Sequence, residues 1–175
     1  MPKSNKIIAI CANDNNGIKD LGCNNKMYWL GDFPGYYATV DDDIVYPPNY
    51  ISELKSKLKQ YNNEIGVSFH GHSYNTNPKY SLFSNRKIIQ YNIKHPDIFC
   101  HRIGMGVGMI YPSKLRISKD MFLTTPKNFG DDEIFAVWAQ KNNIPLLCAS
   151  TYNVDIKPVW NIALSTGLCT NRESM

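Results

Sequence analysis

The order of apolar and polar positions along the chain predicts alternating strands and helices. Short apolar runs rich in β-branched or aromatic residues, bounded by turn formers, predict strands at residues 6–12, 36–40, 65–69, 103–111 and 144–149. Two other stretches have helical spacing, at residues 50–60 and 132–142. Because strands and helices alternate, we expect an α/β fold with a mixed, mostly parallel central sheet and flanking helices.

The stretch between residues 70 and 100 interrupts this alternation. It is polar and rich in Asn and Tyr, with short apolar islands, and predicts a long excursion above the sheet. Loops of this length often carry function. His70 and His72 stand two apart in a strand-like segment, so they share a face and could contact a metal or an acceptor, although such histidines are more often structural. We find no internal repeat and no interdomain linker, so residues 1–175 are expected to form one domain.

Composition narrows the class of protein. The formal net charge is only +4 and the Lys and Arg residues form no consecutive block, which argues against a nucleic-acid partner. The main apolar stretch near the N-terminus, residues 7–12, is too short to cross a bilayer. The 5 cysteines are scattered without a C-x-x-C pair, which favours free thiols in the cytoplasm over a zinc site or a disulfide framework. Peripheral membrane association and self-association remain open.

An acidic triplet is the most informative local feature. Asp41, Asp42 and Asp43 directly follow a predicted strand and precede a proline-led helix, a position at which α/β sheets bind ligands. Three adjacent negative charges repel one another unless a cation compensates. In an extended segment Asp41 and Asp43 would point the same way and share Mg²⁺ or Mn²⁺, with Asp42 pointing oppositely. The alternative is a solvated acidic turn.

A second acidic cluster opens the predicted helix at residues 132–142. Asp131, Asp132 and Glu133 follow Gly130, and a helix N-terminus favours the ionised form of a carboxylate. Such a carboxylate could serve as a base. The alternative is an ordinary N-capping acid with further acids in the first turn.

Together these segments resemble the bacterial nucleotide-sugar glycosyltransferases of GT-A fold, in particular the family-2-like enzymes of capsule and lipopolysaccharide synthesis. Residues 29–50 are similar to the family's metal-binding segment, in which a strand ends in a D-x-D motif and a proline and a helix follow. Residues 128–145 are similar to its G-[ED]-D segment, residues 20–29 to its D-x-G…K segment and residues 104–112 to its Gly-rich strand. The similarity covers roughly residues 6–148.

The resemblance implies a role for each matching residue. Asp132 matches the base that deprotonates the acceptor hydroxyl in an inverting transfer. The donor, a nucleotide diphosphate sugar such as a UDP-sugar, would bind near Asp20, Lys26, Asp41, Asp42 and Asp43. The cofactor Mn or Mg would be held by Asp41 and Asp43. The glycan acceptor would lie near Gly104, Gly106, Gly108 and Asp131.

Two other interpretations stay open. The family's first strand and helix, which hold much of the nucleotide base pocket, have no counterpart before Lys6, so the chain could be a partial, non-catalytic remnant of a glycosyltransferase. Residues 41–45 also satisfy the D-x-D-x-[TV] motif of haloacid-dehalogenase-like phosphatases, with Asp41 as the nucleophile. Against the phosphatase, a helix begins almost at once where that family has a flap. The Q-x-x-R-W motif of processive synthases is absent, which argues against chain elongation.

Overall fold

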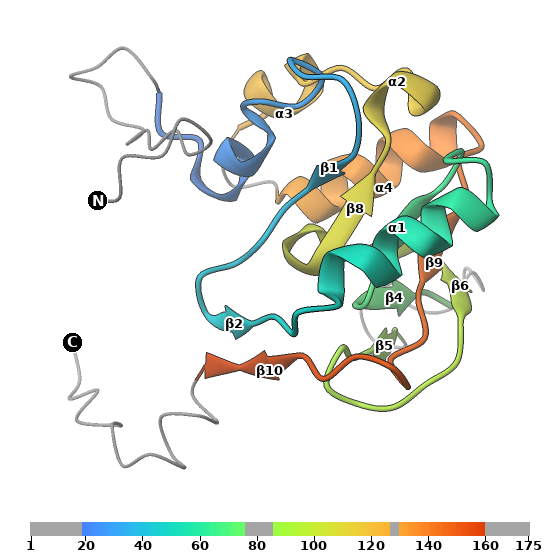
Figure 1. Cartoon of the computed structure of the whole chain (residues 1–175). Helices are drawn as coiled ribbons and strands as arrows, with labels where there is room; N and C mark the ends of the chain where they lie inside the picture. The colour runs from blue at the N-terminus through green and yellow to red at the C-terminus, as the bar shows by residue number, and fades with distance from the viewer. Residues whose placement is uncertain (1–18, 76–85, 127–129, 160–175) are drawn as a thin grey trace, which may run out of the picture.

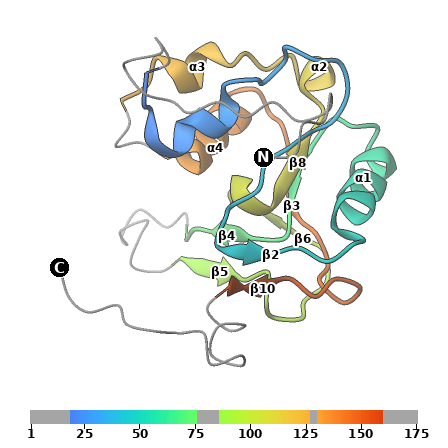
Figure 2. The same cartoon turned by 60° about the vertical axis from the view of Figure 1, so that its left-hand side comes forward.

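The structure is a computed structural model that describes residues 19–75, 86–126 and 130–159. Five strands form the main sheet in the order β1-β8-β3-β9-β6 (Figure 1). Their bounds are β1 (Tyr37–Ala38), β8 (Gly108–Ile110), β3 (Gly66–Ser68), β9 (Leu146–Cys148) and β6 (Ile98–Cys100). Helices α1 (Tyr50–Gln60) and α4 (Asp131–Lys141) cover opposite faces of this sheet (Figure 2).

The two faces of the sheet bury separate hydrophobic clusters. Because neighbouring residues of a strand point to opposite faces, Met109 and Leu147 pack on the α1 side, while Ile110 and Leu146 pack on the α4 side. Leu54 and Leu58 of α1 are fully buried against the first face. Phe135 and Ala139 of α4 are buried on the second face. The core therefore uses part of the apolar spacing that predicted these helices, since Ile51 and Val137 are exposed.

The helix predictions are confirmed. Helix α1 has the predicted bounds, and α4 begins and ends one residue earlier than predicted. The predicted strands at 36–40, 65–69 and 144–149 are present as the shorter strands β1, β3 and β9. The coarse prediction of an α/β fold with flanking helices is confirmed as well.

The prediction of a mostly parallel sheet is wrong. In the main sheet only the pairing of β3 with β9 is parallel, whereas β1–β8, β3–β8 and β6–β9 are antiparallel. The reason is that β8 lies between β1 and β3, antiparallel to both. It separates two strands that are joined through α1 and that would otherwise be parallel neighbours.

A small second sheet explains two further differences. It has the order β5-β4-β7, with β5 (Lys87–Ile89), β4 (Gly71–Ser73) and β7 (Arg102–Ile103). The predicted excursion at 70–100 therefore contains β4, β5 and β6. The predicted single strand at 103–111 is wrong, because the chain leaves β7 at Ile103, forms the 3-10 turn η3 (Met105–Val107) and only then enters β8.

The chain passes between the two sheets at four points, and two of these lie side by side. Residues 69–70 connect β3 of the main sheet to β4 of the small sheet, and residues 104–107 connect β7 to β8. The N–H of Gly104 donates to the carbonyl oxygen of His70 at 2.8 Å, so the two crossing points are hydrogen-bonded to each other. This junction is where the candidate site lies.

The remaining elements lie outside the main sheet and the small sheet. They are η2 (Gly22–Met27), β2 (Ile44–Val45), α2 (Pro112–Leu115), α3 (Asp120–Leu123) and β10 (Lys157–Pro158), with β2 and β10 paired antiparallel. The predicted strand 6–12 and the tail 160–175 lie outside the described residues. In the part of the chain that the structure describes, no helix combines the length and the apolar character needed to span a membrane.

Candidate functional site

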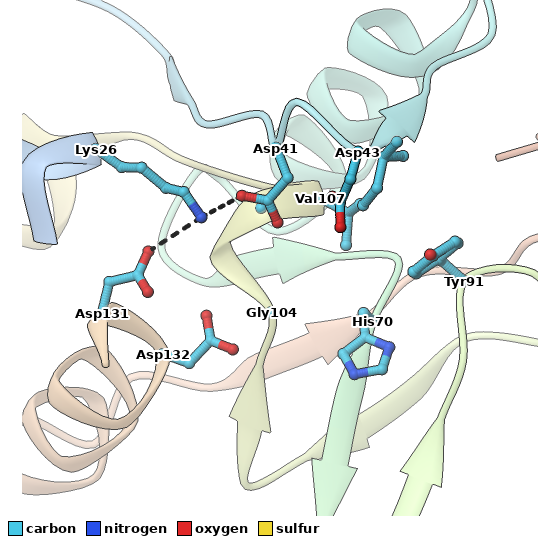
Figure 3. Close-up of a pocket in the computed structure, with 11 residues that line it drawn as sticks. Lys26, Asp41, Asp43, His70, Tyr91, Gly104, Val107, Asp131 and Asp132 are labelled. Atoms are coloured by element: carbon cyan, nitrogen blue, oxygen red, sulfur yellow. Dashed lines mark ion pairs between the residues drawn. The ribbon is translucent and has the colours of Figure 1, made fainter. Parts of the chain in front are cut away.

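A cavity of about 280 Å³ opens at the junction of the two sheets. It is formed by segments that lie far apart in the sequence (Figure 3). Its lining residues are Lys26, Asp41, Asp43, Ile44, His70, Tyr91, Gly104, Gly106, Val107, Asp131 and Asp132. Every segment that the sequence singled out for chemistry thus contributes to one cavity.

The acidic triplet forms a turn rather than the extended segment expected from the sequence. Asp41 and Asp43 nevertheless both line the cavity, whereas Asp42 does not; Asp42 and Asp43 are both exposed. The turn is held by Tyr46, whose hydroxyl accepts a hydrogen bond from the N–H of Asp41 at 2.7 Å. The same hydroxyl donates to the carbonyl oxygen of Gly106 at 2.6 Å, so one side chain joins the acidic turn to the glycine-rich loop.

Lys26 is the cation that faces these acids. Its ammonium group forms an ion pair with Asp41 and lies 4.0 Å from Oδ2 of Asp131 (Figure 3). Burial by itself lowers the pKa of Lys26, but the hydrogen bond to Asp41 and the charges of Asp131, Asp41 and Asp132 raise it overall. Lys26 is therefore positively charged and only partly compensates the four carboxylates that line the cavity.

The loop at residues 104–107 is anchored from the side facing the core. Three side-chain hydroxyls contact its four carbonyl oxygens. Thr39 donates to Met105 and Tyr46 donates to Gly106, while the Ser68 hydroxyl lies 2.7 Å from the carbonyl oxygen of Gly104 and 3.2 Å from that of Val107 and can donate its one proton to either. The opposite side of the loop is left to face the cavity.

Two of the loop glycines make close approaches. The carboxylate of Asp41 lies directly against the Cα of Gly106, and a Cβ at this position would overlap it. A Cβ on Gly104 would lie 3.1 Å from Cδ2 of His70, tighter than ordinary contact. Both positions therefore favour glycine for space rather than for an unusual backbone conformation.

The N-terminus of α4 supplies two carboxylates with different surroundings. The N–H of Met105 donates to Oδ1 of Asp132 at 2.6 Å. Burial raises the pKa of Asp132 to about 6, with the Met105 hydrogen bond opposing the rise and the charge of Asp131 adding to it. Burial also raises the pKa of Asp131, which Lys26 partly offsets. A carboxylate that titrates near pH 6 suits a general base.

His70 and Tyr91 form the part of the lining that lies away from Lys26 and Asp131 (Figure 3). Burial, together with the charge of Arg102, lowers the pKa of His70. Burial, together with the charges of Asp43 and Asp41, raises the pKa of Tyr91. Both side chains are therefore neutral near pH 7.

Other predicted residues are not brought into the cavity lining. Asp20 accepts hydrogen bonds from the N–H of Gly22 at 2.8 Å and from the Asn25 amide at 3.3 Å, at the start of η2. Gly108 is buried in β8, where a Cβ would crowd the carbonyl oxygens of Gly104 and Val67. His72 accepts a hydrogen bond from Nε of Arg102 at 3.0 Å, as a structural histidine does.

Three lining residues were not singled out by the sequence. Tyr91 lies in the polar excursion, and Ile44 and Val107 lie beside recognised motif residues. Only the general expectation that long loops carry function pointed toward Tyr91.

A divalent metal would need oxygen ligands from the residues that line the cavity. Across residues 19–75, 86–126 and 130–159, no three or more His, Cys, Asp or Glu side chains are grouped to enclose an ion. Asp41 and Asp43 do line one cavity and supply the hard oxygen ligands that Mg²⁺ and Mn²⁺ prefer. Mg²⁺ is commonly bound by one or two carboxylates plus substrate phosphates rather than by an all-protein cage, and this donor set fits that mode.

A scan against protein-family models found no family that matches the chain, and a search of curated proteins found no match either.

Proposed function

We propose that this chain is a metal-dependent, inverting glycosyltransferase of the GT-A, family-2-like type. It would move a sugar from a nucleotide diphosphate donor, such as a UDP-sugar, to a hydroxyl group of a glycan acceptor. The observation that supports the proposal most is the common cavity of Lys26, Asp41, Asp43 and Asp132. The motif resemblance requires these residues to act on one substrate, although they come from separate segments.

On this proposal the acidic turn and Lys26 bind the diphosphate. Asp41 and Asp43 would hold Mn²⁺ or Mg²⁺, which when bound stabilises the negative charge that develops on the departing nucleotide diphosphate. Lys26 already lies within ion-pair distance of Asp41 and Asp131, so its ammonium group can turn to a phosphate oxygen without leaving the cavity. Gly106, which has no side chain, lets Asp41 stay close to the loop backbone.

Asp132 would act as the base. Its Oδ1 is held by the N–H of Met105, which fixes the carboxylate at the cavity wall. The carboxylate accepts the proton of the acceptor hydroxyl as that oxygen forms a bond to the anomeric carbon. The bond from the anomeric carbon to the diphosphate oxygen breaks at the same time, and its electron pair leaves with the nucleotide diphosphate.

The size of the cavity sets what it can enclose. Its volume of about 280 Å³ is just below the roughly 300–1,000 Å³ typical of small-molecule sites. We therefore expect it to enclose the sugar and the diphosphate, with the nucleoside outside it.

Isothermal titration calorimetry with UDP in the presence and absence of Mn²⁺ tests the proposal directly. Wild-type protein is expected to bind UDP only when Mn²⁺ is present. Asp41→Asn is expected to weaken this binding by about tenfold or more, since it removes one charged metal ligand. Asp42→Asn removes the same charge from the adjacent position outside the cavity lining, and should weaken the binding less than Asp41→Asn does because no metal ligand is lost.

Three other outcomes would distinguish the transferase from its alternatives. A folded chain that binds no UDP with Mn²⁺ would favour the non-catalytic remnant. A phosphorylated Asp41, trapped after incubation with a phosphate ester and detected by mass spectrometry, would favour the phosphatase. Slow hydrolysis of a UDP-sugar that is lost in Asp41→Asn and Asp132→Asn would support the transferase.

A further inference from the structure

The cavity is divided into a charged part and a neutral part. Lys26, Asp131 and Asp132 lie on one side, and Asp41 and Asp43 extend along the top in the view of Figure 3. His70 and Tyr91 lie on the other side, from the small-sheet end of the junction. A ligand with an ionic group at one end and a neutral polar group at the other would match this division.

The neutral part is an aromatic corner. The rings of His70 and Tyr91 have centroids 6.0 Å apart and planes inclined by 60°. The His70 ring packs against Gly104, and the backbone carbonyl of His70 accepts a hydrogen bond from the N–H of Gly104. Tyr91 packs by its other contacts against the hydrophobic cluster on the α1 face. Both rings are thus held in place by the fold before any ligand arrives.

The corner also has unused hydrogen-bonding capacity. Nδ1 of His70 is buried and has no hydrogen-bond partner in the described part of the chain. A buried polar atom without a partner is energetically unfavourable, so the His70 ring keeps a hydrogen-bonding capacity that the fold does not use. Neutral rings suit hydroxyl groups rather than phosphates, because a neutral imidazole and a phenol can each donate and accept hydrogen bonds.

We propose that His70 and Tyr91 form a subsite for a saccharide ring, with Tyr91 packing on the C–H face of the sugar and His70 facing its hydroxyls. This inference rests on the proposed function and deepens it. A pyranose has an apolar C–H face and a rim of hydroxyls, and aromatic surfaces with a few polar groups are typical of sites for such ligands. The ring could belong to the donor or to the acceptor.

The test compares ligands that differ only by a sugar. Calorimetry in the presence of Mn²⁺ is performed with UDP and with UDP-glucose, UDP-galactose and UDP-N-acetylglucosamine. Saturation-transfer NMR is performed with the methyl glycosides of the same hexoses in the presence of UDP and Mn²⁺. A donor-sugar subsite changes the first set of measurements, and an acceptor subsite changes the second.

Matched variants isolate the aromatic ring. Tyr91→Leu keeps apolar bulk against the core but removes the ring, and Tyr91→Phe keeps the ring but removes the hydroxyl. For a donor subsite we expect Tyr91→Leu to weaken the best UDP-hexose by about fivefold more than it weakens UDP, and Tyr91→Phe to keep most of the affinity. For an acceptor subsite the methyl-glycoside signals should fall in Tyr91→Leu only. Tyr152→Leu, at an exposed tyrosine outside the cavity, is the control.

The subsite and the proposed function can fail separately. UDP binding with Mn²⁺ in wild-type protein tests the function. The subsite proposal is wrong if two results occur together. Tyr91→Leu weakens the binding of UDP and of every UDP-hexose by the same factor, and its methyl-glycoside signals equal those of the wild type. The second result includes the case in which neither protein gives a signal. Circular dichroism melting of each variant confirms that the comparison is made between folded proteins.

Discussion

Replacing Asp132 by Asn is expected to make the protein more stable at neutral pH while removing the proposed base. The pKa of Asp132 is about 6, above its ordinary value of 3.8, and burial is the main cause. A carboxyl group with a raised pKa holds its proton more tightly in the folded than in the unfolded state. The free energy of unfolding therefore falls as the pH rises from about 4 to about 6, and is constant above about 7 as far as this group is concerned.

The size of the effect follows from the two pKa values. A rise from 3.8 to about 6 corresponds to roughly 3 kcal/mol of unfavourable free energy for the ionised form. Asp132 is only partly buried by surface area, so solvent in the cavity screens part of this, and we expect a gain of about 1–2 kcal/mol for Asp132→Asn at about pH 7.5. The Asn oxygen can still accept the Met105 N–H. In a chain of this length the gain corresponds to a rise in Tm of about 2–8 °C.

Urea unfolding of wild type and Asp132→Asn at about pH 7.5 and about pH 4.5 measures the effect. The difference in the free energy of unfolding should shrink by more than half at the lower pH, because the folded wild type is then largely protonated at Asp132. Asp120→Asn is the control, since Asp120 also lies in the first turn of a helix but is exposed. It should lose about 0.5 kcal/mol at about pH 7.5. An Asp132→Asn protein that is less stable than wild type, or equally shifted at both pH values, would refute the reasoning.

Four further outcomes are expected. Lys26→Met should bind Mn²⁺ alone more tightly, because Asp41 loses its competing cation. The same variant should bind UDP with Mn²⁺ more weakly, because the proposed phosphate contact of Lys26 is lost. Electron paramagnetic resonance measures the first change and calorimetry the second. Tyr46→Phe removes the hydroxyl that joins the acidic turn to the loop, and should weaken UDP binding with Mn²⁺ by about tenfold with an unchanged circular dichroism spectrum. Gly106→Ala should displace the Asp41 carboxylate and abolish that binding, measured by the same calorimetry. The transfer rate should rise about tenfold per pH unit up to about pH 6 and then level off, as the carboxylate of Asp132 becomes ionised.

The helices were predictable because their signals are local. Leu54 and Leu58 recur at helical spacing after two prolines, and the same residues are buried against the sheet. The candidate site was predictable in part for a similar reason: acids placed just after a strand and at the start of a helix are positioned by their own elements. Lys26, Asp41, Asp43 and Asp132 were expected at one site, and all of them line the cavity.

The strand order and the sheet junction were not predictable from local pattern. An apolar run at 103–111 has the composition of one strand, but its middle carbonyls bond to hydroxyls of distant residues such as Thr39 and Tyr46. Those partners interrupt the strand, and no periodicity within the run indicates them. Tyr91 was missed for a related reason, because its place in the cavity depends on how the excursion returns past His70.

The hydroxyl anchors of residues 104–107 have a consequence for altering the protein. The residues that hold the loop in shape, Ser68, Thr39 and Tyr46, approach it from the core side. The side chains that would meet a ligand, such as His70 and Tyr91, belong to other segments. The shape of the loop and the direct contacts with a ligand therefore depend on largely separate sets of side chains. A substitution at Tyr91 offers a route to new selectivity, whereas a substitution at His70 would also change the packing against Gly104.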